Sequence, residues 1–135
     1  MIMEEKLSYK VRGAIFEVHK QLGLGLYEEV YEAALMKELD LRGIEAKSQV
    51  VLPVMYKGTE IKEAYRVDIL VEDKIIVELK SVDELRSIHF KQLNNYLHLS
   101  GLYLGFLVNF NCAYMKEGKD LCRVFNNETL EKNDI

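Results

Sequence analysis

Two acidic residues and a lysine are close together in an apolar part of the sequence. Asp68 lies in one apolar segment, Glu78 and Lys80 lie in the next, and a three-residue polar turn centred on Asp73 separates the segments. If the segments pair as antiparallel strands about Asp73, Asp68 faces Glu78, with β-carbons about 5 Å apart. Side chains alternate along a strand, so Lys80 lies on the same face as Glu78. Charges among apolar residues are costly unless they are paired or bind a metal, so this trio predicts either a structural ion pair or a metal-dependent site.

A third acidic residue, Glu28, lies in the apolar stripe of a predicted helix. At 100° per residue its side chain falls within about 20° of Leu35 and Leu39, and it lies close to Tyr31. An acid in the first turn of a helix is also favoured by the helix dipole. The position of Glu28 is therefore consistent with a structural role and with a role in a site.

Polar residues also occur on the inward faces of two other predicted helices. Gln92 and Tyr96 are four residues apart, on a stripe with Ile88 and Leu99, so an amide and a phenol face inward together. Taken alone, this spacing is more typical of ordinary packing. His19 lies near the end of the first predicted helix, where a histidine is more often a capping or core residue than a participant in chemistry.

The elements that must position these residues follow in the order ααβββαββ. Periodicity predicts helices at about 6–22, 27–41 and 86–99, and strands at 49–56, 60–71, 74–81, 103–110 and 114–125. Gly23 and Gly43 end the first two helices. Pro53 lacks a backbone donor, so the first strand lies at a sheet edge or carries a bulge. The pattern predicts an α/β (α+β) fold, a mixed sheet flanked by helices.

These motifs, in this order, resemble the PD-(D/E)xK nuclease superfamily. Asp68, a spacer of nine residues, and Glu78-Leu79-Lys80 are similar to its catalytic motif. Gln92-x-x-x-Tyr96 is similar to the helix that follows this motif in the exonuclease-like branch. Val67 takes the place of the proline in the superfamily name, a proline that many members lack.

A further motif precedes the hairpin. Gly25-x-x-Glu28-x-x-Tyr31 is similar to the signature of the GxxExxY family, a group of small bacterial and archaeal proteins. The combined resemblance covers about residues 8–111. It implies a restriction-endonuclease-like core, with the site at the hairpin formed by the second and third strands.

The resemblance also implies a ligand set. Asp68 and Glu78 would hold Mg²⁺ or Mn²⁺, and Glu28 and the carbonyl of Leu79 would complete the protein ligands. Hard cations prefer such oxygen ligands and keep bound waters. Lys80 would position the attacking water and stabilise negative charge in the transition state.

The remaining residues would support this centre. Gln92 and Tyr96 would orient the metal site or the substrate backbone, and Tyr31 and His19 are expected as further supporting residues. The resemblance implies nucleic acid as the partner. It leaves open DNA or RNA, homo-oligomerisation and any protein partner.

Three functions are consistent with these residues. The first is a metal-dependent nuclease, and the second is a nuclease-fold binding module without turnover. The third is a carboxylate-pair hydrolase such as a glycosidase, which needs two separated acids in a cleft. Lys80, one step from Glu78 on the same face, counts against the third.

The composition limits the number of domains and the ways in which the chain can bind nucleic acid. The chain has 135 residues, with 18 Lys and Arg against 22 Asp and Glu and a net charge of -4. This predicts one domain at 1–125 and a polar tail at 126–135. Nucleic-acid binding through bulk positive charge is excluded, so any contact must be local or metal-assisted.

The sequence also indicates where the protein acts. No apolar run reaches the roughly 20 residues of a membrane helix, and acids at Glu4 and Glu5 do not suit a signal peptide. We therefore expect a cytoplasmic protein without membrane contact. Cys112 and Cys122 have no metal-site spacing, and both are predicted to be reduced thiols packed in strands.

Overall fold

A computed structural model describes residues 2–126, without the side chains of residues 2–4, 63 and 64. Its elements are α1 (Ile2–Leu22), α2 (Glu28–Leu41), β1 (Ala46–Tyr56), β2 (Thr59–Val71), β3 (Ile75–Lys80), α3 (Ser87–Ser100), β4 (Leu104–Asn109) and β5 (Leu121–Phe125). The predicted order ααβββαββ is confirmed. Of the predicted tail, residues 127–135 lie outside the described part of the chain.

The sheet has five strands in the spatial order β1-β2-β3-β4-β5. β3 and β4 pair in parallel, and the other neighbouring pairs are antiparallel. Parallel neighbours need a crossover connection, and α3 provides it between β3 and β4. The sheet is therefore mixed, as the sequence predicts.

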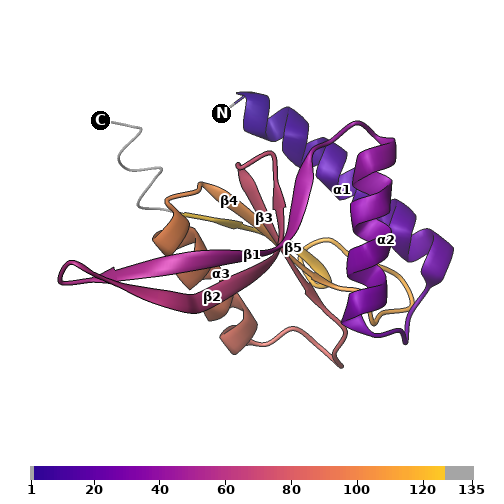
Figure 1. The fold of residues 1–135 in the computed structure, drawn as a ribbon. Helices are drawn as coiled ribbons and strands as arrows, with labels where there is room; N and C mark the ends of the chain where they lie inside the picture. The colour runs from indigo at the N-terminus through magenta and orange to yellow at the C-terminus, as the bar shows by residue number, and fades with distance from the viewer. Residues whose placement is uncertain (1, 127–135) are drawn as a thin grey trace.

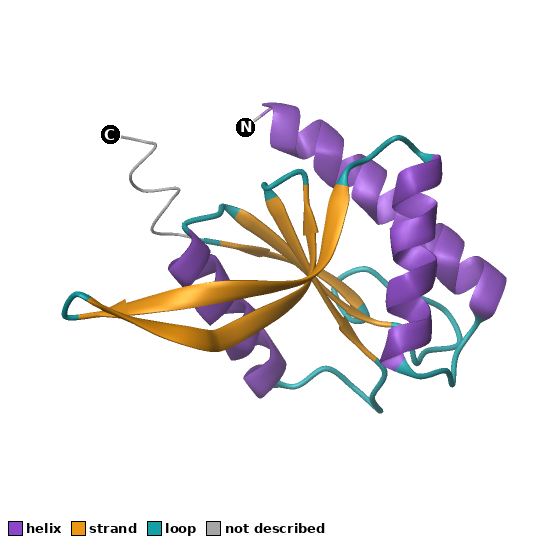
Figure 2. Ribbon diagram, viewed as in Figure 1, coloured by secondary structure: helices purple, strands orange, loops and turns teal. Residues whose placement is uncertain are grey.

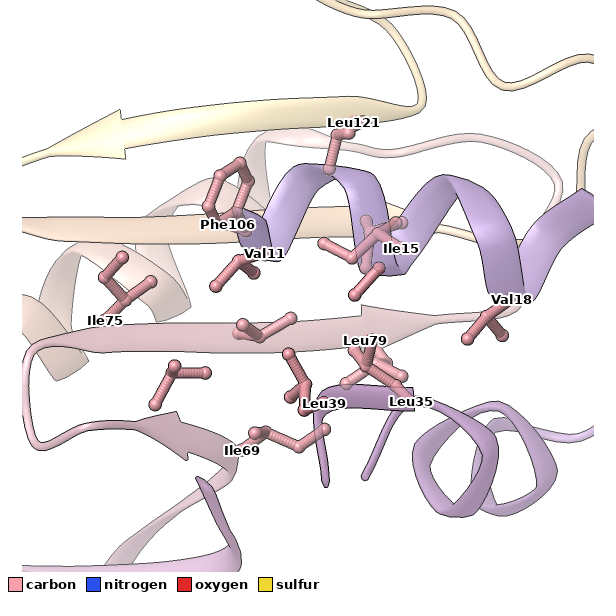
Figure 3. Packing of buried hydrophobic residues seen from close by; sticks show 14 of the residues in the cluster. Val11, Ile15, Val18, Leu35, Leu39, Ile69, Ile75, Leu79, Phe106 and Leu121 are labelled. Carbon is pink, nitrogen blue, oxygen red and sulfur yellow. The ribbon is translucent and has the colours of Figure 1, made fainter. Parts of the chain in front are cut away.

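Helices cover both faces of the sheet (Figures 1 and 2). On one face, side chains of α1 and α2 pack on the sheet in the larger buried cluster (Figure 3), which includes Val11, Ile15, Val18, Leu35, Leu39, Ile69, Ile75 and Leu79. On the other face α3 covers a smaller cluster with Val67, Ile76, Leu93, Tyr96, Leu97 and Leu107. β3 and β4 lie between these two layers, which is why their sequences are apolar almost throughout.

The β1–β2 hairpin extends well past the body of the sheet (Figure 1). β1 is an edge strand, and its register with β2 shifts between Leu52 and Val54. Pro53 lies at this shift, where its missing donor costs no ladder hydrogen bond. The prediction of an edge or a bulge at Pro53 is confirmed.

The prediction for the last strand is wrong over its first half. β5 begins at Leu121, not at 114. Residues before it form turns, because Gly118 takes a left-handed φ of 83° and the buried Asp120 accepts a hydrogen bond from the Lys116 backbone. The prediction that both thiols lie in strands is wrong for Cys112, which lies in the loop after β4, and is confirmed for Cys122, which lies in β5.

Two smaller predictions also need correction. Ile88 is 64% exposed, so the inward face of α3 is formed by Leu93, Tyr96 and Leu97 instead. Asn126, assigned to the tail, is buried and its amide donates to the backbone carbonyls of Leu97 and Leu102. Among the described residues, no helix is long and apolar enough to cross a membrane.

Candidate active site at the end of the β2–β3 ladder

The predicted register of the β2–β3 hairpin is confirmed. Backbone pairing joins Val71 to Ile75, Leu70 to Ile76 and Ile69 to Val77. One step further along this register, Asp68 lies opposite Glu78.

At that step, hydrogen bonds from backbone amides to carboxylate side chains replace the backbone-to-backbone hydrogen bonds of the ladder. The amide of Asp68 donates to Oε1 of Glu78 at 2.9 Å, and the amide of Leu79 donates to Oδ2 of Asp68 at 2.9 Å. Each acidic side chain therefore satisfies a backbone donor of the opposite strand. These cross-strand bonds hold the two carboxylates against each other at the point where the strands separate.

Strand β2 also changes face here. Val67 packs on the α3 side, whereas Ile69, two residues later, packs in the cluster under α1 and α2. Regular alternation would put both on one face, so β2 turns over at Asp68. The pairing of β1 with β2 includes Ser48–Ile69 and Val50–Val67 and skips the position between them, Gln49 opposite Asp68.

Burial and like charge control the protonation of the pair. Glu78 is only 3% exposed. Desolvation, followed by the charge of Asp68, raises the pKa of Glu78 to about 8. Desolvation also raises the pKa of Asp68, against the hydrogen bond from Leu79 and the charge of Lys80. Without a cation, burial and mutual repulsion therefore favour a pair that holds a proton at neutral pH.

Lys80, Gln92 and Tyr96 form a polar chain beside the carboxylates. Nζ of Lys80 donates to Oε1 of Gln92 at 3.2 Å, and Gln92 lies one helical turn before Tyr96, close enough to lower the pKa of its phenol against the larger effect of burial. Burial, then the negative charge of Glu78 and Asp68, raises the pKa of Tyr96 to about 12, so the phenol stays neutral. The two α3 residues thus meet the hairpin as the sequence predicts.

Close helix packing fixes α3 at this position. A Cβ at Gly105 of β4 would come within 2.8 Å of the Leu93 side chain, so glycine lets the helix approach the sheet closely. Leu93 is adjacent to Gln92 in the chain. The close approach at Gly105 therefore holds the part of α3 that carries Gln92 against the sheet.

Glu28 borders the site from α2. Its side chain is largely exposed, and partial burial raises its pKa, against the charge of Lys80 and together with that of Asp68. It lines an open hollow of about 450 Å³ between residues 25–29, Ser81 and Asn111. In the described part of the chain, no three His, Cys, Asp or Glu side chains are grouped closely enough to hold a metal ion. The expected third ligand therefore lies at the rim of the site.

Tyr31 supports the loop that carries Glu28. Its buried hydroxyl donates to the carbonyl of Gly23 at 2.6 Å and accepts from the amide of Leu26 at 3.2 Å. Its ring stacks on Phe110, with centroids 4.5 Å apart. Tyr31 therefore fixes the segment that contains Gly25 and leads into α2 at Glu28.

His19 has different neighbours. It is 8% exposed, its Nε2 lies 2.7 Å from the carbonyl oxygen of Cys112, and its ring lies near Phe110. These contacts connect α1 to the loop after β4. They are the contacts of a core histidine, the alternative that its sequence position already allowed.

Two residues of the site were not found from the sequence. Nε2 of Gln49 donates to Oε1 of Glu32 at 2.6 Å, and its side chain faces Asp68 and lowers the pKa of that carboxyl, against the larger effect of burial. Desolvation and the charges of Asp68, Glu29 and Glu28 raise the pKa of Glu32. Glu32 lies one helical turn after Glu28, which is the signal that could have revealed it. Nothing in the local sequence marks Gln49.

The donor set suits a hard divalent cation. Mg²⁺ is typically bound through one or two carboxylates, several waters and substrate phosphate oxygens, without a full protein cage. Asp68 and Glu78 supply two adjacent carboxylates, and burial, the largest cause, raises the pKa of both, so a bound cation would stabilise their ionised forms. Lys80 adds a fixed positive charge beside them.

Comparisons with known proteins agree with this geometry. A family model described as the PD-(D/E)XK nuclease superfamily matches residues 5–123. No curated protein matches the chain. A solved structure titled "Crystal structure of SSO0001" is similar with a TM-score of 0.54 and 18% identity. That similarity covers 79% of this chain and 56% of that one, and it shows the fold alone. The predicted restriction-endonuclease-like α+β fold is confirmed.

Proposed function

The chain belongs to the PD-(D/E)XK nuclease superfamily, and from this premise we propose that it is a divalent-metal-dependent nuclease that hydrolyses phosphodiester bonds. One observation carries the proposal. Asp68 and Glu78 replace the backbone ladder at the end of the β2–β3 hairpin, and Lys80 follows beside them. A carboxylate pair with an adjacent ammonium is costly to bury and contributes little to folding, so a chemical role accounts for it best.

In this proposal Asp68 and Glu78 would hold Mg²⁺ or Mn²⁺, with Glu28 and the carbonyl of Leu79 as further ligands. The bound cation would lower the pKa of a water and neutralise charge on the phosphate. Lys80 donates to Gln92, and its ammonium would position the attacking water and stabilise the negative charge that develops on phosphate oxygens. Tyr96 stays protonated and supplies a hydroxyl donor beside Glu78.

The finer assignments are part of the same proposal. The hydrogen bonds of Tyr31 support membership of the GxxExxY family, because they fix Gly23 and Leu26, the residues on either side of the segment that contains the motif glycine, Gly25. Nucleic acid is the proposed partner, and the cytoplasm is the proposed location. The division into one domain at 1–125 is proposed with Asn126 added, because its side chain is packed into the fold.

A second candidate has one observation in its favour. Glu28 is not grouped with Asp68 and Glu78 as a ready metal cage in the part of the chain described here. This favours a nuclease-fold module that binds nucleic acid without turnover. The two functions differ in whether the protein cleaves nucleic acid, and the nuclease alone needs the ammonium of Lys80 for cleavage.

A cleavage assay distinguishes these functions. The wild type and Lys80→Ala are incubated with single- and double-stranded DNA and RNA, with Mg²⁺, with Mn²⁺ or with chelator. We expect cleavage that depends on the divalent ion and falls by about 100-fold or more in Lys80→Ala, since a group that stabilises only the transition state is lost. Equal activity of the two proteins would refute the catalytic role of Lys80, and nucleic-acid binding without cleavage would support the binding module.

A further inference from the structure

Gln49 has an unusual backbone conformation for its place in the chain. Four described non-glycine residues have a positive φ: Gln49 at 53°, Lys57 at 47°, Glu72 at 49° and Asp73 at 55°. The last three lie in the turns between β1 and β2 and between β2 and β3, where left-handed residues are common. Gln49 lies within β1. A positive φ is unfavourable for a residue that has a Cβ, so the surrounding structure must stabilise this backbone conformation of Gln49.

The Gln49 side chain lies between two carboxylates from different elements. Its Nε2 donates to Oε1 of Glu32 on α2 at 2.6 Å. Its side chain also faces Asp68 on β2 and lowers the pKa of that carboxyl, against the larger effect of burial. The side-chain NH₂ group has two hydrogens, so one amide has a donor for each carboxylate. Glu32 thereby anchors the group that contacts Asp68.

The strained position coincides with the break in both ladders. Gln49 is opposite Asp68 in the register, and this is the pair that the β1–β2 ladder skips. Before this point Ala46 packs towards α1 and α2, and after it Val50 packs towards α3. β1 therefore turns over in step with β2, and the amide of Gln49 meets Asp68 where the strands separate.

We propose that Gln49 is a positioning residue of the active site: its amide, anchored by Glu32, fixes the carboxylate of Asp68 in the orientation that binds the divalent cation. The inference rests on the proposed function. It extends the site to residues of β1 and α2 that the Asp68, Glu78 and Lys80 motif does not contain. Partners of this kind orient ligand side chains and tune their affinity for metal.

The alternative is that Gln49 only bends the sheet. A bend at a left-handed residue is satisfied by glycine, which adopts positive φ without penalty. Gln49→Gly therefore separates the two roles, because it keeps the backbone conformation and removes the amide. Lys57→Gly is the matched control, since it relieves the same conformation at the hairpin tip, away from the site.

The experiment measures Mn²⁺ affinity by calorimetry and melting temperature without metal, for the wild type, Gln49→Gly and Lys57→Gly. We expect Gln49→Gly to fold with an unlowered melting temperature and to bind Mn²⁺ about 10- to 100-fold more weakly. Lys57→Gly should bind Mn²⁺ as the wild type does. Wild-type affinity in folded Gln49→Gly would overturn the proposal and leave the proposed function intact. Failure of the wild type to bind Mn²⁺ would refute both.

Three further variants keep the test decisive. If Gln49→Gly does not fold, Gln49→Asn replaces it, because asparagine tolerates left-handed φ and its shorter amide does not span both carboxylates. Glu32→Gln retains an acceptor for the amide and should keep Mn²⁺ affinity close to that of the wild type. Glu32→Ala removes the anchor and should lose affinity as Gln49→Gly does. Wild-type affinity in Glu32→Ala would overturn the anchoring role.

Discussion

The two ends of the β2–β3 hairpin are built differently. Near the turn, backbone hydrogen bonds join residues 69–71 to residues 75–77. Five of these six side chains have no exposed surface: Ile69, Val71, Ile75, Ile76 and Val77. At the other end the ladder stops, and the carboxylates of Asp68 and Glu78 accept the backbone donors. We call these parts the closed end, residues 69–71 and 75–77, and the open end, Asp68 and residues 78–80.

The comparison shows how stability and chemistry are separated within one hairpin. The closed end gains free energy from apolar burial and complete backbone pairing. The open end retains charged groups in a largely buried position, which costs free energy without a bound cation. The rigid closed end fixes the register, and the register places Asp68 beside Glu78.

Truncating the closed end should have the largest effect on stability. Ile75→Ala creates a cavity at a position with no exposed surface, and we expect a loss of about 2–5 kcal/mol in the free energy of unfolding. Urea denaturation measures it. Ile61→Ala is the matched control, because Ile61 is 47% exposed on the hairpin arm and its loss should lie within about 0.5 kcal/mol. Equal losses would contradict the distinction between core and arm.

Removing a charge from the open end should stabilise the metal-free protein. The pKa of Glu78 is about 8 in the folded protein, against an ordinary value of 4.5. The folded chain therefore holds a proton that the unfolded chain releases, so the free energy of unfolding falls as pH rises from about 4.5 to 8. Glu78→Gln keeps the acceptor for the Asp68 amide and should gain roughly 1–3 kcal/mol at pH 8. Denaturation at pH 5 and pH 8 tests this, and a stability difference between mutant and wild type that does not change with pH would contradict it.

The smallest stability effect is expected on α3. Gln92→Ala removes the partner of Lys80 and should lower the cleavage rate by about 10- to 100-fold. Its free energy of unfolding should change by less than about 0.5 kcal/mol. Denaturation midpoints and cleavage rates are compared for the same preparations. A loss of about 1–3 kcal/mol with unchanged specific activity would mean that Gln92 is a structural residue whose partner is left unsatisfied.

The site residues that the sequence reveals are those with a regular local pattern. The hairpin register follows from the turn centred on Asp73 and from the apolar segments on either side. Gln92 and Tyr96 follow from helical spacing. Each of these inferences needs only the period of one element, so periodicity was sufficient.

The parts that the sequence misses depend on contacts between distant elements. Gln49 has its role because α2 and β2 approach β1, and a left-handed glutamine inside a strand has no local sequence signal. The strand that was wrongly predicted at 114–120 is the reverse case, in which a local sequence signal is present but does not determine the structure. Tyr114 and Met115 favour a strand locally, whereas Gly118 and the buried side chain of Asp120 determine turns.

The central claim is that the open end of the hairpin binds a divalent cation through its carboxylates. Calorimetric Mn²⁺ titration of the wild type, Asp68→Asn and Lys80→Ala tests it most directly, because the asparagine side chain keeps a hydrogen-bond acceptor for the Leu79 amide and loses only the charge. We predict saturable binding by the wild type and by Lys80→Ala, and at least about tenfold weaker binding by Asp68→Asn. Equal affinity in Asp68→Asn, or no saturable binding by the folded wild type, would contradict the claim.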